Sequence, residues 1–315
     1  MDISERLNVT STQEEIEPFL ELTPELVQKR RSQGRIIFDR FIRNKAAIGG
    51  AVFLILLFLF CFFGPTVTGH NDPNAINVTS ASASLAGPSL QSPFGTDAVG
   101  RDEFARAMAG GQVSLLVAMT SMFMAILFGI GVGAFAGFYG GIVDTILMRL
   151  TDVVLSVPLY LLLFVLSASF TDGTPRSVIV LIAILSWTYA SRLVRGEFLS
   201  LKEREYVLAA RTIGARNLRM MFRHILPNAA GPIIVNATLL VGANIILESV
   251  MSYFGFGIKP PDASWGTMIS DGQGYFSVNP WLVWAPGLLI FFTVLSFNLV
   301  GDGLRDALDP YMTER

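Results

Sequence analysis

Few side chains in this sequence have the type and spacing that catalysis or metal binding requires. The single cysteine, Cys61, lies inside an apolar run, which excludes an intrachain disulfide and argues against a cysteine-based metal site. The two histidines, His70 and His224, lie far apart in the sequence, so we expect no histidine-based metal centre. The sequence therefore predicts no catalytic, metal-binding or cofactor-binding residues in this chain.

Nucleotide hydrolysis is also not expected of this chain. A P-loop needs glycine followed by lysine and serine or threonine, because that backbone and that lysine hold the phosphates. The four lysines follow Gln28, Asn44, Leu201 and Ile258, so none of them stands in such a loop. If the protein uses ATP, we expect a partner subunit to hydrolyse it.

Six ionisable residues stand inside or beside long apolar segments, namely Asp144, Arg149, Asp152, Arg192, Glu248 and Asp302. An unpaired charge inside a bilayer costs at least about 2.5–3.5 kcal/mol, so these residues should lie at interfaces, pair, or face water. Arg149 and Asp152 are one turn apart on one helical face and can pair with each other. The six positions match neither an ion relay, which needs several mid-helix charges, nor the catalytic pair of an intramembrane enzyme.

The elements that carry these residues are those of a membrane protein. The 315 residues are 52% hydrophobic and 15% charged, with mean hydropathy +0.53, whereas soluble domains carry about 25% charged residues. The net charge of −2 gives no reason to expect a nucleic-acid partner. A membrane helix needs about 17–25 mostly apolar residues. The apolar stretches between charged residues predict six such helices, over residues 46–67, 113–137, 146–168, 177–196, 229–251 and 282–302.

The distribution of lysine and arginine predicts the orientation of these helices. With six crossings and both termini cytosolic, eighteen basic residues lie inside and four lie outside, as the positive-inside rule expects. The first 45 residues contain no short apolar core, so we expect no cleaved signal peptide and a cytosolic amino terminus. We expect the segments 1–45, 198–224 and 303–315 to face the cytosol, and 72–110 and 256–280 to face outward.

The segments outside the predicted core also contain sequence patterns that predict helices. Thr23, Pro24 and Glu25 predict the start of a short helix, although a disordered tail is an equally good interpretation of residues 1–22. Apolar residues between arginines at 36–42 predict an interfacial helix. The predicted organisation is a cytosolic segment 1–45, a first helix 46–67, an external loop with an interfacial entry over 68–112, a core 113–302 and a tail 303–315.

One face of the second predicted helix carries a small residue at every fourth position. These residues form a stripe of Ser121, Ala125, Gly129, Gly133, Gly137 and Gly141. Small residues at this spacing let another helix approach closely, which matters in lipid because apolar surface alone does not favour contact between helices. The stripe predicts a packing face, and the partner helix could come from this chain or from another subunit.

The segment between the fourth and fifth predicted helices, residues 198–228, is amphipathic, and we call it the coupling loop. Tyr206, Ala210 and Ile213 have the spacing of one helical face. A second face consists of Leu218, Met221, Phe222 and Ile225. We predict two short helices separated at Gly214, the second ending at Pro227. Because a loop that only satisfies charge topology need not be amphipathic, we expect a soluble partner to dock here.

The coupling loop resembles the EAA loop of bacterial ABC importer permeases. The resemblance rests on Glu205, Tyr206, Ala209, Ala210, Gly214, Leu226 and Pro227. The pattern Tyr-Val-x-Ala-Ala-Arg-x-x-Gly has the form found in the dipeptide and oligopeptide branch. One departure is that Leu208 stands directly before the alanine pair, where that family has a glutamate.

Other segments are similar to the C-type permease of this branch, and the similarity covers about residues 36–311. They are Phe94–Asp102, Gln112–Leu116, Ser252–Pro261, Ser264–Gly266 and Asn298–Pro310. The resemblance implies the type I ABC importer permease fold, an all-α membrane fold with six transmembrane helices here, in the plasma membrane of a bacterium or archaeon. It also implies dipeptide or oligopeptide transport, although the family contains importers of nickel, glutathione and other solutes.

The resemblance further implies several partners. These are a homologous B-type permease subunit, one or two cytosolic ATPases that bind ATP and Mg, an extracytoplasmic peptide-binding protein, and the lipid bilayer. The outer segments 94–106 and 256–271 should then lie near the docked binding protein. The residues expected in that contact are Asp97, Arg101, Lys259 and Asp262.

Two other classes of membrane protein are alternatives. A secondary transporter or channel would work without ATPases and would usually show intramembrane charges or paired broken helices. Pro158 gives the only clear helix break in this sequence. A non-transporting scaffold would have no water-accessible path. Co-purification of ATPase subunits would separate the importer from both.

Overall fold

The computed structural model describes residues 33–76, 84–170 and 172–309. These residues are helical or irregular and contain no strand, only the isolated bridges Ile76–Arg101 and Thr96–Asp102. The helix predicted to start at Thr23 lies outside the described residues. The elements are α2 (Gln33–Arg43), α3 (Lys45–Thr68), α4 (Glu103–Tyr139), α5 (Gly141–Ser156), α6 (Leu159–Phe170), α7 (Pro175–Leu201), α8 (Glu205–Thr212), α9 (Asn217–Arg219), the π-helical η5 (Met220–Ile225), α10 (Leu226–Tyr253), α11 (Trp265–Gly272), the 3-10 helix η6 (Gln273–Tyr275) and α12 (Trp281–Leu308).

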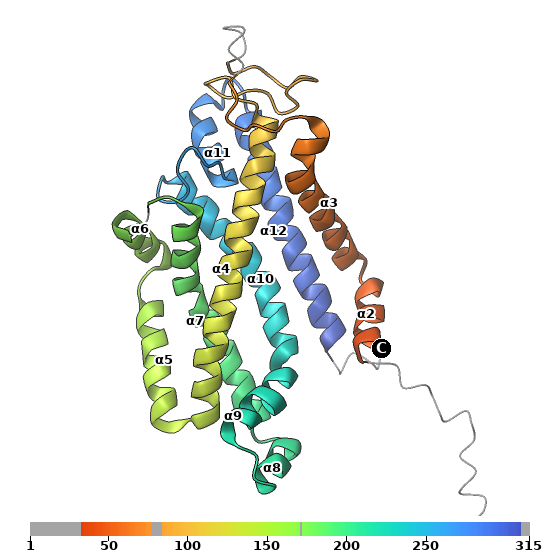
Figure 1. Ribbon diagram of the computed structural model, residues 1–315, viewed down its shortest axis with the longest axis vertical. Coiled ribbons are helices and arrows are strands. Elements are labelled where there is room, and N and C mark those ends of the chain that lie inside the picture. The colour runs from red at the N-terminus through yellow and green to blue at the C-terminus, as the bar shows by residue number, and fades with distance from the viewer. Residues whose placement is uncertain (1–32, 77–83, 171, 310–315) are drawn as a thin grey trace, which may run out of the picture.

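All six predicted apolar segments are helical. Among the described residues, five helical segments are long and apolar enough to cross a membrane, and the bent pair of α5 and α6 makes a sixth if it is one span. The long helices run alternately in opposite directions (Figure 1). The outer loop and α11 lie at one end of the bundle, whereas α8, α9 and the ends of α2 and α12 point toward the other end.

The second predicted helix is longer than expected. Helix α4 begins at Glu103 rather than at residue 113, and its 37 residues continue without a break to Tyr139. The expected interfacial entry is therefore part of this same helix. Asp102 caps it by accepting a hydrogen bond from the backbone N–H of Phe104 at 3.1 Å. Burial raises the pKa of this aspartate, whose carboxylate lies 3.5 Å from His70.

The third predicted helix, residues 146–168, is not one continuous helix. Helices α5 and α6 meet at an angle of 87°. The break lies at Val157 and Pro158, as the sequence indicated, because proline disfavours the helical conformation of the preceding residue. Three other prolines, Pro65, Pro232 and Pro286, lie inside long helices without ending them.

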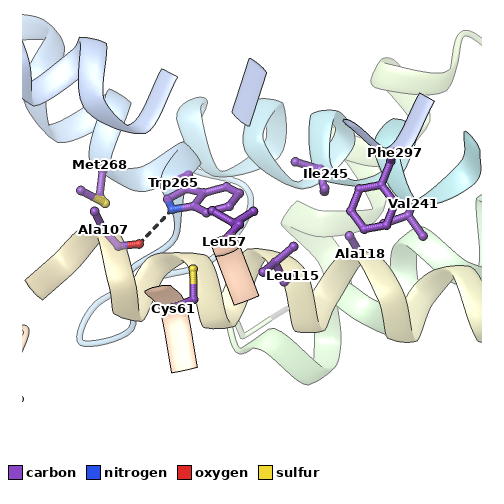
Figure 2. Close-up of a cluster of buried hydrophobic side chains, with 10 residues drawn as sticks. All are labelled: Leu57, Cys61, Ala107, Leu115, Ala118, Val241, Ile245, Trp265, Met268 and Phe297. Atoms are coloured by element: carbon purple, nitrogen blue, oxygen red, sulfur yellow. Dashed lines mark hydrogen bonds between the residues drawn. The ribbon is translucent and has the colours of Figure 1, made fainter. Parts of the chain in front are cut away.

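A buried cluster joins five helices, α3, α4, α10, α11 and α12 (Figure 2). Trp265 of α11 is fully buried and donates from its indole nitrogen to the carbonyl of Ala107 in α4 at 3.0 Å. Leu57 and Cys61 of α3 and Phe297 of α12 complete this side of the core. The free cysteine is thus a small apolar core residue.

Helix α2, over the segment predicted to be interfacial, packs beside the end of α12. The guanidinium of Arg40 donates to the carbonyl of Asp309 at 2.8 Å, and the amide of Asn44 donates to Asp306 at 3.3 Å. Phe38 and Ile42 remain exposed on the other side of α2. An exposed apolar edge beside basic residues is typical of a helix at a membrane surface.

Candidate functional site

The coupling loop folds into two short helical segments at one end of the bundle (Figure 1). Gly214 follows α8 with a φ of +81°, a left-handed conformation that favours glycine. The chain reverses here because the N–H of Gly214 donates to Arg211 and that of Ala215 donates to Ala210, both at 3.0 Å. The predicted separation of two helices at Gly214 is confirmed.

The predicted faces of these two helices are only partly correct. Val207 and Ala210 are the buried residues of α8, whereas Tyr206 and Ile213 are 41% and 86% exposed. The eight-residue helix α8 therefore packs through Val207 and Ala210 rather than through the expected face of Tyr206, Ala210 and Ile213. In the second segment Met221 and Ile225 are buried, while Leu218 and Phe222 are exposed. The buried side chains join a cluster with α4, α7 and α10, which holds the loop against the bundle.

The prediction that Pro227 ends the second helix is wrong. Leu226 and Pro227 occupy the first turn of α10, and the N–H of Leu226 donates to the carbonyl of Met221 in the preceding turn. The π-helical turn η5 leads directly into this helix, so residues 217–253 form one helical segment. Glu205, Ala209 and Pro227 are exposed, whereas Leu226 is half-buried in the cluster just described.

The coupling loop presents an apolar surface with basic residues around it. Its exposed large apolar side chains are Tyr206, Leu208, Ile213, Leu218 and Phe222. Its exposed basic side chains are Arg204, Arg211, Arg216, Arg219 and Arg223. Desolvation raises the pKa of Tyr206 above that of an ordinary phenol. Such a surface suits a protein partner with apolar pockets and acidic groups.

The helices that flank this surface are longer than the hydrocarbon layer is thick, so the surface has room to lie outside that layer. Helix α4 and the segment 217–253 have 37 residues each. At 1.5 Å per residue each is about 55 Å long, whereas the hydrocarbon core of a bilayer is about 30 Å thick. The coupling loop joins the ends of α7 and α10 at one extremity of the molecule, so a soluble partner can reach it (Figure 1).

The small-residue stripe of α4 packs against α7 of the same chain. Side-chain carbons added at Gly129, Gly133 and Gly137 would collide with α7 atoms of residues 190–198. Ser121 and Ala125 are buried along the same face. Gly141 does not belong to the stripe, because it lies beyond the end of α4, has a φ of +52° and has open space around it.

Two ion pairs tie α5 to α7. Arg195 makes two hydrogen bonds to Asp144, at 2.5 and 2.6 Å, and Arg192 donates to Asp152 at 2.6 Å. The predicted option that Arg149 pairs with Asp152 is therefore wrong. The sequence could not reveal the observed partners, because they are about forty to fifty residues apart and meet only when α5 folds back along α7.

A buried polar row on α10 was not predicted as a unit. Asn244, Glu248 and Ser252 recur every fourth residue and are almost fully buried. Glu248 accepts hydrogen bonds from Ser114 of α4 at 2.9 Å and from Ser252 at 2.7 Å. Ser114 in turn accepts from the N–H of Trp265 at 3.3 Å. The sequence signal for this row was Glu248, the single acidic residue in an apolar helix. Its partners could not be read from the sequence, because Ser114 lies on another helix and Ser252 lies one turn further along α10.

The row continues from Asn244 toward the middle of the bundle. Its amide donates to Ser121 of α4 at 2.9 Å, and its oxygen accepts from Ser186 of α7 at 3.1 Å. Buried polar groups that find such partners fix one arrangement of the helices, since any other arrangement leaves them unsatisfied. The row therefore locks α4, α7 and α10 together.

The residues predicted to face a binding protein fall into two groups. Asp97 is only 4% exposed and organises its own loop, accepting hydrogen bonds from the N–H groups of Val99 and Arg101 and from the Arg101 guanidinium at 2.6 Å. Its carboxylate is therefore not available as a direct contact. Lys259 and Asp262 are exposed, and the backbone of Lys259 donates to Gly173 at 2.9 Å.

Comparison with known proteins decides the family. The model of the binding-protein-dependent transport system inner membrane component matches residues 129–314. The chain belongs to this family. The model of the N-terminal TM domain of oligopeptide transport permease C matches residues 32–93, so the two models together cover most of the chain. This permease is therefore an inner-membrane component of a transport system.

Named relatives agree with this assignment. The permease is 40% identical to the oligopeptide transport system permease protein OppC of Bacillus subtilis, over 86% of this chain and 87% of that protein. It is 38% identical to the dipeptide transport system permease protein DppC of Alkalihalophilus pseudofirmus, over 89% and 91%. In fold it is similar to a chain of the MetNI methionine ABC transporter in an inward facing conformation, with a TM-score of 0.53 and 18% identity over 64% of this chain and 95% of that chain. As an ABC importer permease, it acts with an ATPase and a binding protein.

Proposed function

We propose that this chain is the C-type permease subunit of an ATP-driven, binding-protein-dependent importer of dipeptides or oligopeptides. It would form half of the translocation pathway beside a homologous B-type permease. The names of the relatives support the peptide substrate, since the permease aligns with oligopeptide and dipeptide permeases over most of its length. The subunit itself performs no bond chemistry, and one or two partner ATPases bind ATP and Mg and hydrolyse the nucleotide.

The observation that carries this proposal is the exposed apolar surface of the coupling loop. Ile213 is 86% exposed at a tight turn that is held from behind by buried Val207 and Ala210. A folded loop with exposed isoleucine, leucine and phenylalanine is typical of a docking surface. We assign this surface to the ATPase, with its motion passed to α7 and α10 through the buried side of the loop. Exposed Lys259 and Asp262 at the other end of the permease are assigned to the binding protein.

The test uses the complete transporter in proteoliposomes, with an Ile213→Asp variant and an Ile213→Leu control. Burying an isoleucine side chain at an interface contributes about 1.5–3 kcal/mol, so the aspartate should weaken ATPase association about 10- to 150-fold. The leucine control keeps the apolar contact and should bind normally. Ala210 is not the position to test, because it is buried and a larger side chain there would disturb the loop itself.

Two measurements complete this experiment. ATPase subunits retained on the permease are quantified, and ATP-driven uptake of a dipeptide, a pentapeptide, glutathione and Ni²⁺ is compared. We expect uptake of a peptide by the unmodified complex and its loss in Ile213→Asp at normal membrane level. Normal ATPase binding and uptake in Ile213→Asp would refute the role of the loop. Uptake of only nickel or glutathione would refute the peptide substrate.

A further inference from the structure

The bend between α5 and α6 lies beside the middle of the apolar helix α7. A cavity of about 270 Å³ at the bend is lined by residues 154–159 and by Leu185 and Tyr189 of α7. Helix α7 has 27 residues and is about 40 Å long at 1.5 Å per residue. The hydrocarbon core is about 30 Å thick, so at most about 10 Å of α7 can lie outside it at either end. Leu185 and Tyr189 are at least about 15 Å from both ends of α7, which places the bend inside the hydrocarbon layer.

The ion pair between Arg192 and Asp152 also lies inside this layer. Arg192 is about 26 Å from the start of α7 and about 14 Å from its end. A guanidinium can reach toward an interface on its long apolar stem, but the short side chain of Asp152 holds this one at 2.6 Å. The two side chains are 50% and 52% exposed. This chain therefore leaves half of a charged pair uncovered at membrane depth.

Lipid cannot cover this surface at low cost. Charged side chains inside a membrane face protein or water, and backbone that leaves the helical form is tolerated at that depth only in the same surroundings. Val157 at the bend has an extended backbone and is exposed, as are Ser156 and Pro158. Asp152 is one helical turn before Ser156 on the same side of α5. We call this surface the bend face, and it consists of Asp152, Ser156, Val157, Pro158, Tyr189 and Arg192.

The exposed middle of α3 shows what a surface suited to lipid looks like. Ile55, Leu56 and Leu59 are all exposed there, and all are apolar. Helix α3 has 24 residues and is about 36 Å long, so Ile55, about 15 Å from its start, also lies inside the hydrocarbon layer. The bend face therefore differs in chemistry from an exposed surface at a comparable depth.

Water satisfies the bend face better than an apolar helix of another subunit would. A guanidinium has five N–H donors and a carboxylate has about four acceptor sites, and the hydrogen bond between Arg192 and Asp152 uses only part of this capacity. Exposed Tyr189, three residues before Arg192, adds a hydroxyl to the same face of α7. An apolar cover would leave these groups unsatisfied, which is costly.

We propose that the bend face lines the water-filled passage through which the solute crosses the membrane. The inference rests on the proposed function, because it assigns this face to the pathway of a peptide importer. The remaining donors of Arg192 and acceptors of Asp152 are then available to a solute that carries both charges. A peptide with its ammonium and carboxylate ends is such a solute.

The test measures the reaction of single cysteines in the complete transporter in proteoliposomes, with Cys61 replaced by alanine. Ser156→Cys and Tyr189→Cys place a thiol on the bend face at two independent positions, and Ile55→Cys is the control on α3. The probe is a negatively charged methanethiosulfonate. Only the thiolate reacts and lipid suppresses its formation, so both bend-face thiols should react at least about tenfold faster than the control.

Transport gives a second measurement on the same variants. A dipeptide supplied during ATP turnover should slow the labelling of Ser156→Cys, and the attached reagent should block uptake in Ser156→Cys but not in Ile55→Cys. Reaction of both bend-face cysteines no faster than Ile55→Cys would overturn the inference. Fast reaction only when the homologous permease subunit is omitted would also overturn it, because the face would then be a subunit interface. Failure of the unmodified transporter to import any peptide would instead refute the proposed function.

Discussion

The contact between α4 and α7 gives a sharp test of the packing of this permease. A side-chain carbon at Gly137 would lie 2.7 Å from the Cβ of Phe198 and 2.8 Å from the backbone oxygen of Arg195. Ordinary contacts between such atoms are about 3.5–4.0 Å. The Arg195 oxygen is backbone and cannot rotate away, so Gly137→Ala must push the two helices apart or distort one of them.

The size of the effect follows from a matched pair of variants. Overpacking a close contact costs about 1–3 kcal/mol. Alanine also gains about 1 kcal/mol of helix propensity over glycine, which would hide part of that cost. Gly131→Ala is the control, because Gly131 is in the same helix and has no atom within 4 Å of the added carbon. The difference between the two variants isolates the steric cost.

The measurement is the free energy of unfolding of the purified permease in mixed micelles. We expect Gly137→Ala to be about 1–3 kcal/mol less stable than Gly131→Ala. Gly129→Ala alone should cause a similar loss, because its added carbon would lie 2.5 Å from the Cβ and 3.1 Å from the backbone of Ala190. Equal stability of Gly137→Ala and Gly131→Ala would refute the assignment of the stripe to α7.

Two further predictions concern the polar row and the orientation. Glu248→Ala should lower the free energy of unfolding by about 1–3 kcal/mol or more, because Ser114 and Ser252 lose their shared acceptor. Glu248→Gln keeps an acceptor and should lower it less. Equal melting temperatures of the two variants would contradict this prediction. A cysteine at exposed Arg216, with Cys61 replaced, should react with an impermeant thiol reagent only after the membrane is opened, and strong labelling of intact cells would reverse the proposed orientation.

Much of the fold could be predicted because, in a lipid bilayer, the length of each apolar segment and the positions of the charged residues determine where the helices lie. Five of the six apolar stretches form single helices and the third forms the bent pair of α5 and α6, while the Gly214 turn and the Pro158 break were found from single residues. The ends of the helices were less predictable. Helix α4 extends to Glu103 because Asp102 caps it outside the apolar stretch, where a hydropathy pattern carries no signal. Helix α11, capped by Ser264, is too short for periodicity to reveal.

Features of the candidate sites that depend on neighbouring residues in the sequence were predicted, and features that depend on contacts between distant segments were missed. The coupling loop was located from its amphipathic pattern, but which of its residues are buried depends on contacts with α4, α7 and α10. Asp97 was expected at a docking surface because it is charged and lies in an outer loop. The structure instead uses its carboxylate to fold that loop, since two N–H groups and Arg101 already occupy it.

The helical segment 217–253 connects the two ends of the permease mechanically. At one end η5 is buried in the cluster behind the coupling loop, and at the other Glu248 and Ser252 bind Ser114 and the N–H of Ile258. Because this segment is packed against the coupling-loop cluster at one end and hydrogen-bonded at the other, we infer that a displacement of one end is passed to the other. A displacement of the coupling loop would then reach the segment 254–265 and α11 at the opposite end of the bundle (Figure 1). The same segment would transmit docking of a binding protein in the opposite direction, since coupling between two sites is reciprocal.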